Sequence, residues 1–140
     1  MIIYLLICKK NLVRDQLKKI LIIDDEEDFL FSVKTVLDAF KNDCEIITIE
    51  SCEKCVELME TDLKPDVIIL DIAFPGMDGF SLHDKIQLHD RWKNTPIIFT
   101  TAWGDNTRRQ QVNALGCDFI EKPFTNNDIL YILDKHLKTD

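Results

Sequence analysis

Hydrophobic and polar residues follow one another along the chain in two distinct patterns. Short runs of branched apolar residues between turn signals predict buried strands, and apolar residues three or four positions apart predict amphipathic helices. The predicted strands are residues 20–23, 45–50, 67–71, 97–100 and 117–121. The predicted helices are a first one with the apolar stripe Phe29, Leu30, Val33, Val36, Leu37 and Phe40, then residues 52–63, 80–92 and 105–115, and a last helix after Thr125.

These segments form βα units with short connections. Strands and helices that alternate at this spacing favour a parallel sheet with helices on both faces. Ser51 and Thr125 are predicted to cap the helices that follow them, because a hydroxyl oxygen can accept a hydrogen bond from a free amide at a helix start. Gly116 is predicted to end the helix over residues 105–115. The pattern therefore predicts an α/β domain.

The beginning of the chain does not fit this alternation. The segment MIIYLLIC, residues 1–8, is apolar but shorter than the roughly 20 residues that cross a bilayer. It also lacks the basic region and the cleavage site of a signal peptide. We predict an N-terminal extension over residues 1–18, which adds a strand or helical turns to the domain or contacts a second subunit, and one domain over residues 19–140.

The composition limits the kinds of molecule that the chain is expected to bind. The chain has 140 residues, of which 46% are hydrophobic and 30% charged, as in ordinary globular domains. Its formal net charge of −8 argues against a general nucleic-acid binder, which needs a basic face to neutralise phosphates. A partner with a basic surface, or a bound metal cation, agrees better with this charge.

The cysteines and histidines suggest no site of their own. Five cysteines are an odd number, and reduced thiols of a cytoplasmic protein are the interpretation we favour. Cys52 and Cys55 form a CxxC pair without the second pair or the histidines that a zinc site needs. His83, His89 and His136 lack metal-ligand spacing and are predicted to be solvated helix residues.

Polar residues follow four of the predicted strands at the point where each strand ends. They are Asp24 and Asp25, Asp71, Thr101 and Lys122. Because parallel strands end at the same edge of a sheet, these side chains are expected to meet there. Three carboxylates would repel one another, and a magnesium ion, which prefers oxygen ligands, removes that repulsion. Such a site can attach a phosphoryl group to Asp71, with Lys122 and Thr101 on the phosphoryl oxygens.

Four motifs in order carry a family resemblance. DDE after the first strand, LDIAFPGMDG around the third, TTA after the fourth and KPF after the fifth resemble the receiver domain of two-component response regulators, which is CheY-like. The resemblance runs from Lys19 to about Leu137. It implies a doubly wound, flavodoxin-like sheet of five parallel strands in the order 2-1-3-4-5, to which the N-terminal extension would be an addition.

The same resemblance implies a role for each matched residue. Asp71 would be the phosphoacceptor, and Thr101 and Lys122 would contact the phosphoryl group. Magnesium would be held by Asp25 directly, by Asp24 through water, by Asp71 and by the main-chain carbonyl of Ala73. Phe119 would be the switch aromatic that moves with Thr101, and the Lys122–Pro123 peptide bond is expected to be cis.

Two residues depart from what is frequent in the family. Ala73 stands two residues after the phosphoacceptor, where a polar side chain is common, and Trp103 stands two residues after Thr101. Both positions border the path of the water that would hydrolyse the aspartyl phosphate. A methyl group cannot orient that water and an indole could exclude it, so a long-lived phosphorylated form is expected.

The resemblance also implies the partners. A histidine kinase or a histidine phosphotransfer protein would donate the phosphoryl group to Asp71, and residues 105–137, which include Arg108 and Arg109 on a solvated helix face, would form the face that binds a downstream protein. The chain would not bind DNA directly or enter a membrane, it would catalyse only its own phosphorylation and dephosphorylation, and it could form a homodimer.

Three alternatives are less compatible with the residues. A magnesium-dependent phosphatase of the haloacid-dehalogenase type needs a second acid where Ala73 stands. A phosphorylation-independent interaction module would not need Asp71, Asp25 and Lys122 together. A nucleotide-binding or flavin-binding domain would be expected to carry a GxGxxG motif or a P-loop, and neither is present.

Overall fold

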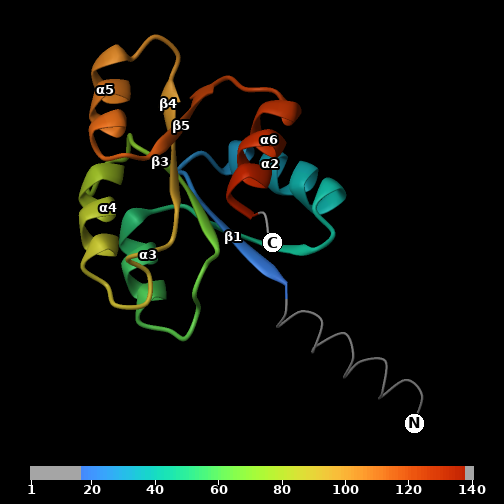
Figure 1. Ribbon diagram of the computed structural model, residues 1–140, viewed down its shortest axis with the longest axis horizontal. Coiled ribbons are helices and arrows are strands. Elements are labelled where there is room, and N and C mark those ends of the chain that lie inside the picture. Colours follow the sequence, from blue (N-terminus) through green and yellow to red (C-terminus); the bar gives the residue numbers. More distant parts are fainter. Residues whose placement is uncertain (1–16, 138–140) are drawn as a thin grey trace.

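The computed structural model describes residues 17–137, which form five strands and five helices (Figure 1). Each predicted strand and helix is present, in the predicted order. Their bounds are β1 Lys18–Ile23, α2 Glu27–Phe40, β2 Cys44–Ile49, α3 Cys52–Met59, β3 Val67–Asp71, α4 Gly79–Gln87, β4 Ile97–Ala102, α5 Asn106–Ala114, β5 Asp118–Lys122 and α6 Asn126–Leu137.

The five strands form one parallel sheet in the order β2-β1-β3-β4-β5. This confirms the predicted doubly wound topology. The order reverses between β1 and β3, which lie side by side at the centre of the sheet. In doubly wound sheets a ligand site lies where the order reverses, outside the carboxyl ends of the strands.

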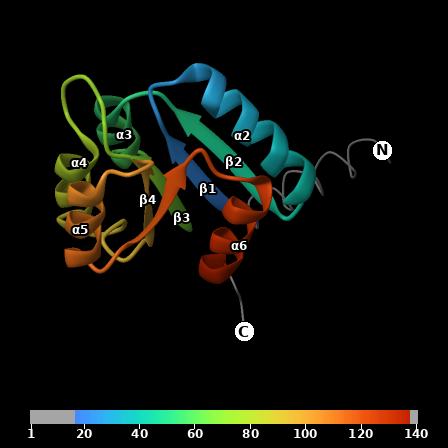
Figure 2. The same cartoon turned by 90° about the horizontal axis from the view of Figure 1, so that it is seen from above.

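Helices cover the two faces of the sheet, as Figure 2 shows: α2 and α6 on one face, α3, α4 and α5 on the other. Successive side chains of a strand point to opposite faces, so each central strand contributes to both cores. In β1, Ile20 and Ile22 pack with α2 and α6, whereas Leu21 and Ile23 pack on the other face. Because both of their faces are buried, the central strands are apolar at successive positions.

Two helices are shorter than the sequence pattern predicts. Residues 60–63 do not continue α3, and residues 88–92 do not continue α4. The segments that follow the two helices are bonded to each other. Arg91 donates hydrogen bonds to the carbonyls of Met59 and Thr61, and the indole of the buried Trp92 donates to the carbonyl of Leu63 at 2.8 Å.

Phe40 and His83 differ from their predicted environment. Phe40, predicted in the buried stripe of α2, is 65% exposed, because it is the last residue of the helix and the chain turns away at Lys41. His83, predicted to be solvated, is buried, with its ring 5.8 Å from the ring of Phe99 and its Nε2 3.8 Å from Cys117 Sγ. The helix pattern alone does not show that α4 turns this histidine toward β4.

Several local predictions are confirmed. Ser51 accepts a hydrogen bond from the amide of Lys54, and Thr125 accepts one from the amide of Asp128. Gly116 follows α5 with a φ of 73°, in the left-handed region that favours glycine. The Lys122–Pro123 peptide bond is cis.

The predicted extension needs one adjustment. β1 begins at Lys18, one residue before the expected start of the domain at Lys19. The strand or subunit contact expected for the rest of residues 1–18 lies outside the described residues, apart from Leu17. Among the helices of the described part, none combines the length and the apolar character of a membrane span.

Candidate functional site

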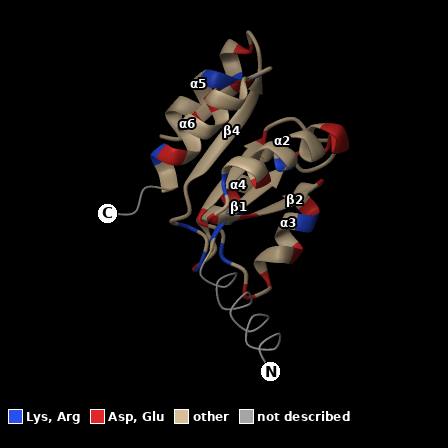
Figure 3. Cartoon of the chain, turned by 90° about the vertical axis from the view of Figure 1, so that its right-hand side faces the viewer, with Lys and Arg blue, Asp and Glu red and all other residues tan. Residues whose placement is uncertain are grey.

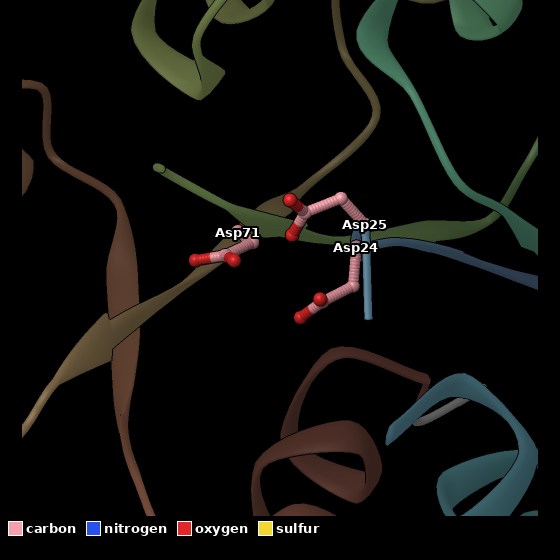
Figure 4. Close-up of side chains that lie close together, drawn as sticks. All are labelled: Asp24, Asp25 and Asp71. Atoms are coloured by element: carbon pink, nitrogen blue, oxygen red, sulfur yellow. The ribbon is translucent and has the colours of Figure 1, made fainter. Parts of the chain in front are cut away.

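Three carboxylates meet where two central strands end. Asp24 and Asp25 follow β1 directly, and Asp71 is the last residue of β3. Each offers a carboxylate oxygen, and these oxygens lie within 4.8 Å of one another. Figure 4 shows the three side chains turned toward a common space. Because the strands are parallel neighbours, the sequence pattern alone was sufficient to predict this cluster.

The three carboxylates differ in their access to solvent. Asp24 is only 1% exposed, Asp71 is partly buried and Asp25 is exposed. The amide of Glu26 donates to Asp24 Oδ1 at 2.9 Å, and the amide of Ile72 donates to Asp71 Oδ1 at 2.8 Å. Both buried side chains are therefore held in place by backbone amides, and Asp25 is the carboxylate most open to an incoming ion.

Lys122 brings the opposite charge from the end of β5. Its Nζ lies 2.5 Å from Asp24 Oδ2 and 3.6 Å from Asp71 Oδ2, and 4.1 Å from the centre of the Phe29 ring. Burial lowers the pKa of Lys122, but the hydrogen bond to Asp24 and the charge of Asp71 outweigh this, so the pKa is raised overall. Lys122 is thus a firmly protonated cation at the centre of the site.

The pKa of Asp71 is raised from its ordinary value. Burial is the main cause, and the negative charge of Asp24 adds to it. Lys122 and the backbone amides of Ile72 and Ala73 oppose this shift without cancelling it. Asp71 therefore lies in a place where its negative charge is incompletely compensated, as expected of a carboxylate that awaits a cation.

The donor set of the cluster fits magnesium. Carboxylate oxygens on a partly open edge are the ligands that this ion prefers, and it keeps several waters of its own. The carbonyl of Ala73 is the further ligand that the family resemblance implies, and Ala73 lines the same cleft as Asp71. We find no His or Cys in the cluster, so softer metals are less well matched.

Thr101 carries a hydroxyl that the rest of the site leaves free. It is 1% exposed, and its Oγ1 has no hydrogen-bond partner within the described part of the chain. A buried hydroxyl without a partner costs free energy, so a ligand or a water that bonds to it would be stabilising. Thr101 lines the cleft together with Asp71 and Lys122, as the sequence predicts.

The cleft above these residues has a volume of about 610 Å³. Its polar floor lies at the ends of β3, β4 and β5, and apolar side chains of α2 and α6 extend it. Lining residues besides Asp71, Thr101 and Lys122 include Phe29, Val36, Ala73, Arg108 and Ile129. The site is therefore large enough for a phosphoryl group and part of a partner protein.

Phe119 is half-buried in β5, beside Phe99 in β4. The guanidinium carbon of Arg109 lies 5.2 Å from the centre of the Phe119 ring, and its Nη1 lies 3.2 Å from Glu121 Oε1. Arg109 is therefore not simply a solvated residue of the helix face, as predicted, but covers the aromatic ring.

Trp103 does not have the predicted position beside the site. Its side chain is 78% exposed and lines a separate groove with Phe119 and Tyr131, on the surface formed by β5 and α6. The indole therefore does not cover Asp71, and the prediction that it excludes water from the cleft is wrong. Ala73, the other residue on which that prediction depends, does line the cleft, where its side chain is only a methyl group.

Sequence reasoning missed two contacts that shape the site. Glu53 of α3 accepts a hydrogen bond from the amide of Met77 at 3.2 Å and so fixes the loop after Asp71. Arg108 of α5 lines the cleft itself. Neither residue belongs to a motif, and both depend on side-chain directions that hydrophobic periodicity does not report.

The CxxC pair has no part in the site. Cys52 and Cys55 are fully buried and free, and burial raises the pKa of each thiol to about 12. Thiols of this kind are neither nucleophiles nor metal ligands at neutral pH. The prediction of two cysteines without special chemistry agrees with this environment.

Known proteins share both the sequence pattern and the fold. Residues 20–134 match the family model described as "Response regulator receiver domain". The sensory transduction protein BceR of Halalkalibacterium halodurans is 36% identical over 107 residues, which are 76% of this chain and 44% of BceR. The chain spans less than half the length of the first curated relatives that it matches.

Solved structures agree with this match. A putative response regulator from Chloroflexus aurantiacus is 28% identical with a TM-score of 0.78, and the match covers 86% of this chain and 98% of that one. The receiver domain of the sensor histidine kinase PA1611 from Pseudomonas aeruginosa PAO1, described with a magnesium ion in its active-site cleft, has a TM-score of 0.75 at 22% identity, over 86% of this chain and 97% of that one. The chain belongs to the receiver domain family of two-component response regulators.

Proposed function

We propose that Asp71 is the phosphoacceptor of this chain and that a phosphohistidine of a histidine kinase or phosphotransfer protein is the donor. The observation that carries the proposal is the convergence of Asp71, Lys122 and the free hydroxyl of Thr101 in one cleft, next to a carboxylate cluster that fits magnesium. Phosphorylation of an aspartate is typical of the family to which the chain belongs.

In the proposed reaction, a carboxylate oxygen of Asp71 forms a bond to phosphorus while the bond from phosphorus to the donor imidazole nitrogen breaks. The nitrogen keeps the electron pair. Lys122 neutralises charge on the phosphoryl oxygens from a distance of 3.6 Å to Asp71 Oδ2, and Thr101 donates its hydroxyl to one of them.

Asp25, Asp24, Asp71 and the carbonyl of Ala73 would hold magnesium in this proposal. The bound ion supplies further charge neutralisation at the phosphoryl oxygens. The magnesium ion of the Pseudomonas aeruginosa receiver domain supports this part of the proposal. We assign no other enzymatic activity to the chain, because Ala73 offers only a methyl group where a phosphatase of the haloacid-dehalogenase type needs a second acid.

The proposed output is a change in residues 105–137. Thr101 would move toward the phosphoryl group, and Phe119 would follow into the space beneath it, which would disturb the contact between Phe119 and Arg109. A downstream protein would read this face, without direct binding of the chain to DNA. For the N-terminal extension, residues 1–18, we keep both a strand or helical turns added to the domain and a contact with a second subunit. We place the chain in the cytoplasm, where the free thiols of Cys44, Cys52, Cys55 and Cys117 stay reduced.

Phosphorylation by phosphoramidate, a small donor with a phosphorus–nitrogen bond, tests the proposal. In the presence of magnesium the wild-type chain is expected to be phosphorylated, as seen by a mobility shift in a phosphate-affinity gel. Asp71→Asn should abolish the shift, because an amide is not a nucleophile. The control Asp90→Asn removes an exposed acid away from the site and should behave as the wild type. A shift that persists in Asp71→Asn would disprove the assignment.

Tryptophan fluorescence offers a second readout. Trp92 is fully buried against α3, whereas Trp103 is exposed beside Phe119. Beryllofluoride, which mimics a phosphoryl group on a carboxylate, is expected to change the emission of the wild type and of Trp92→Phe, but not of Trp103→Phe or Asp71→Asn. A response that remains in Trp103→Phe would mean that the change does not reach the 105–137 face in the proposed way.

A further inference from the structure

Arg108 and Lys122 are the two cationic residues that line the cleft. Arg108 is in the first turn of α5, a helix whose basic residues are drawn blue in Figure 3. We propose that Arg108 is a second phosphoryl-binding residue: when Asp71 is phosphorylated, its guanidinium leaves Asp105 and pairs with phosphoryl oxygens. The inference rests on the proposed function and adds a residue to it.

The present partner of Arg108 holds it only weakly. Its Nη1 lies 3.6 Å from Asp105 Oδ2, which is an ion pair but longer than a hydrogen bond, and the side chain is 43% exposed. Asp105 Oδ1 already accepts a hydrogen bond from the backbone amide of Arg108 and caps α5 in this way. Exposed pairs of this kind contribute little to stability, so the guanidinium can leave at little cost.

The neighbouring arginine is held differently. Arg109 forms a closer ion pair with Glu121 and covers the ring of Phe119, so both its charge and its flat surface are already used. Arg109 also does not line the cleft with Asp71. Of the two arginines, Arg108 is therefore the one that is free to respond to new charge in the cleft.

The charge balance of the phosphorylated site favours a second cation. A phosphoryl group carries about 1.5 to 2 negative charges at neutral pH. It replaces the single charge of the Asp71 carboxylate, so the site gains up to about one negative charge. Lys122 is already hydrogen-bonded to the buried Asp24 at 2.5 Å, so it can give the phosphoryl group only part of its donor capacity. A guanidinium binds phosphate oxygens with two parallel hydrogen bonds, a geometry that a lysine cannot offer.

Neither the side chain of Ala73 nor that of Trp103 offers the phosphoryl group a hydrogen-bond donor. Ala73 contributes only a methyl group, and the indole of Trp103 points into another groove. Arg108 is thus the residue of α5 whose side chain lines the cleft. Its move to the phosphoryl group would also draw the first turn of α5 toward Asp71, and so couple phosphorylation to the start of the 105–137 face.

Beryllofluoride affinity at saturating magnesium, measured by calorimetry, tests the inference. Arg108→Ala is expected to weaken the affinity by about 10-fold or more, the effect of one lost charge-assisted hydrogen bond. Arg108→Lys should recover part of it. The control Lys34→Ala removes a cation with the same 43% side-chain exposure, which pairs with Asp38 within α2 at 2.9 Å, and should leave the affinity unchanged.

A purely structural role for Arg108 predicts something else. In that case Arg108→Ala would also weaken magnesium binding in the absence of beryllofluoride, whereas our inference predicts unchanged or tighter magnesium binding, because a positive charge is removed. Wild-type affinity in Arg108→Ala, a parallel loss of magnesium affinity, or an equal loss in Lys34→Ala would overturn the inference. Failure of the proposed function looks different: beryllofluoride would then not bind the wild type, or would bind Asp71→Asn equally well.

Discussion

Replacement of Gly79 by alanine is expected to destabilise the protein by about 3 kcal/mol, the upper part of the range for overpacked sites. A Cβ atom at Gly79 would lie 2.4 Å from the carbonyl oxygen of Asp71 and 2.9 Å from Cα of Ile72. Both are backbone atoms, so no side-chain rotation can relieve the overlap. The amide of Gly79 also donates to the carbonyl of Ile72 at 2.9 Å, which holds α4 close to the end of β3.

The same replacement is expected to weaken magnesium binding. The overlap can be relieved only if α4 moves away from β3 or if the end of β3 shifts, and Asp71 is the last residue of that strand. A shift there would separate the carboxylate of Asp71 from those of Asp24 and Asp25. Urea denaturation gives the free energy of unfolding, and a magnesium titration of the folded variant gives the affinity.

Gly104→Ala is the matched control. Gly104 has a φ of 82°, so alanine is strained there by roughly 1–2 kcal/mol, but its Cβ would meet no atom within 4 Å. This variant should lose some stability and keep the magnesium affinity of the wild type. Two results would contradict this explanation: Gly79→Ala is as stable as Gly104→Ala, or it binds magnesium as tightly as the wild type. Either would mean that glycine is required at position 79 for a reason other than contact with the Asp71 carbonyl.

The sheet and the acidic cluster were predictable for one physical reason. A strand buried on both faces must be apolar at every position, as in Val67–Leu70, and a carboxylate that follows such a run is placed at the edge of the sheet. Two strands end in this way, β1 before Asp24 and Asp25 and β3 at Asp71, and neighbouring parallel strands end at the same edge of the sheet. The proximity of these carboxylates was therefore predictable from the sequence pattern, whereas the strand order and the role of each residue were implied by the family resemblance.

The features that were not predicted depend on contacts between distant segments. The segment that follows α3 is hydrogen-bonded to Arg91 and Trp92, which lie about 30 positions away along the chain. The outward direction of Trp103 and the inward direction of Arg108 depend on how α5 packs on β5. Hydrophobic periodicity predicts which face of a helix or strand is buried. It does not predict into which pocket a polar side chain at the edge of that face points.

Replacement of Lys122 by glutamine is expected to destabilise the magnesium-free protein by about 2 kcal/mol, less than the cost of breaking a fully buried ion pair because Lys122 keeps some contact with solvent. Lys122 is the cation beside Asp24, which is 1% exposed, and beside Asp71. Without it the carboxylates repel one another in a site that is largely shielded from water. Urea denaturation in a chelator measures this loss.

Magnesium is expected to reverse the effect. Since the ion no longer competes with an ammonium group, it should bind Lys122→Gln more tightly than the wild type, by roughly 10-fold if the lost repulsion is near 1.4 kcal/mol. Lys135→Gln is the control, because Lys135 forms an exposed pair with Asp118 at 3.0 Å outside the site. If Lys122→Gln remains less stable than the wild type in saturating magnesium, as measured by the free energy of unfolding, charge repulsion does not explain the loss.

The pH dependence of the deficit distinguishes charge from packing. Burial already raises the pKa of Asp71 above the ordinary value of 3.8, and Lys122 opposes that shift, so its loss should raise the pKa further. A carboxyl whose pKa is raised by folding favours the folded state while protonated and loses that contribution as the pH rises through the raised value. The loss in free energy of unfolding of Lys122→Gln should therefore be full at neutral pH and shrink as the pH falls toward the ordinary carboxyl pKa. A packing defect would cause the same loss at neutral and at acidic pH.

Beryllofluoride separates the two roles of Lys122. The affinity for beryllofluoride should fall in Lys122→Gln, whereas the affinity for magnesium should rise in the same variant.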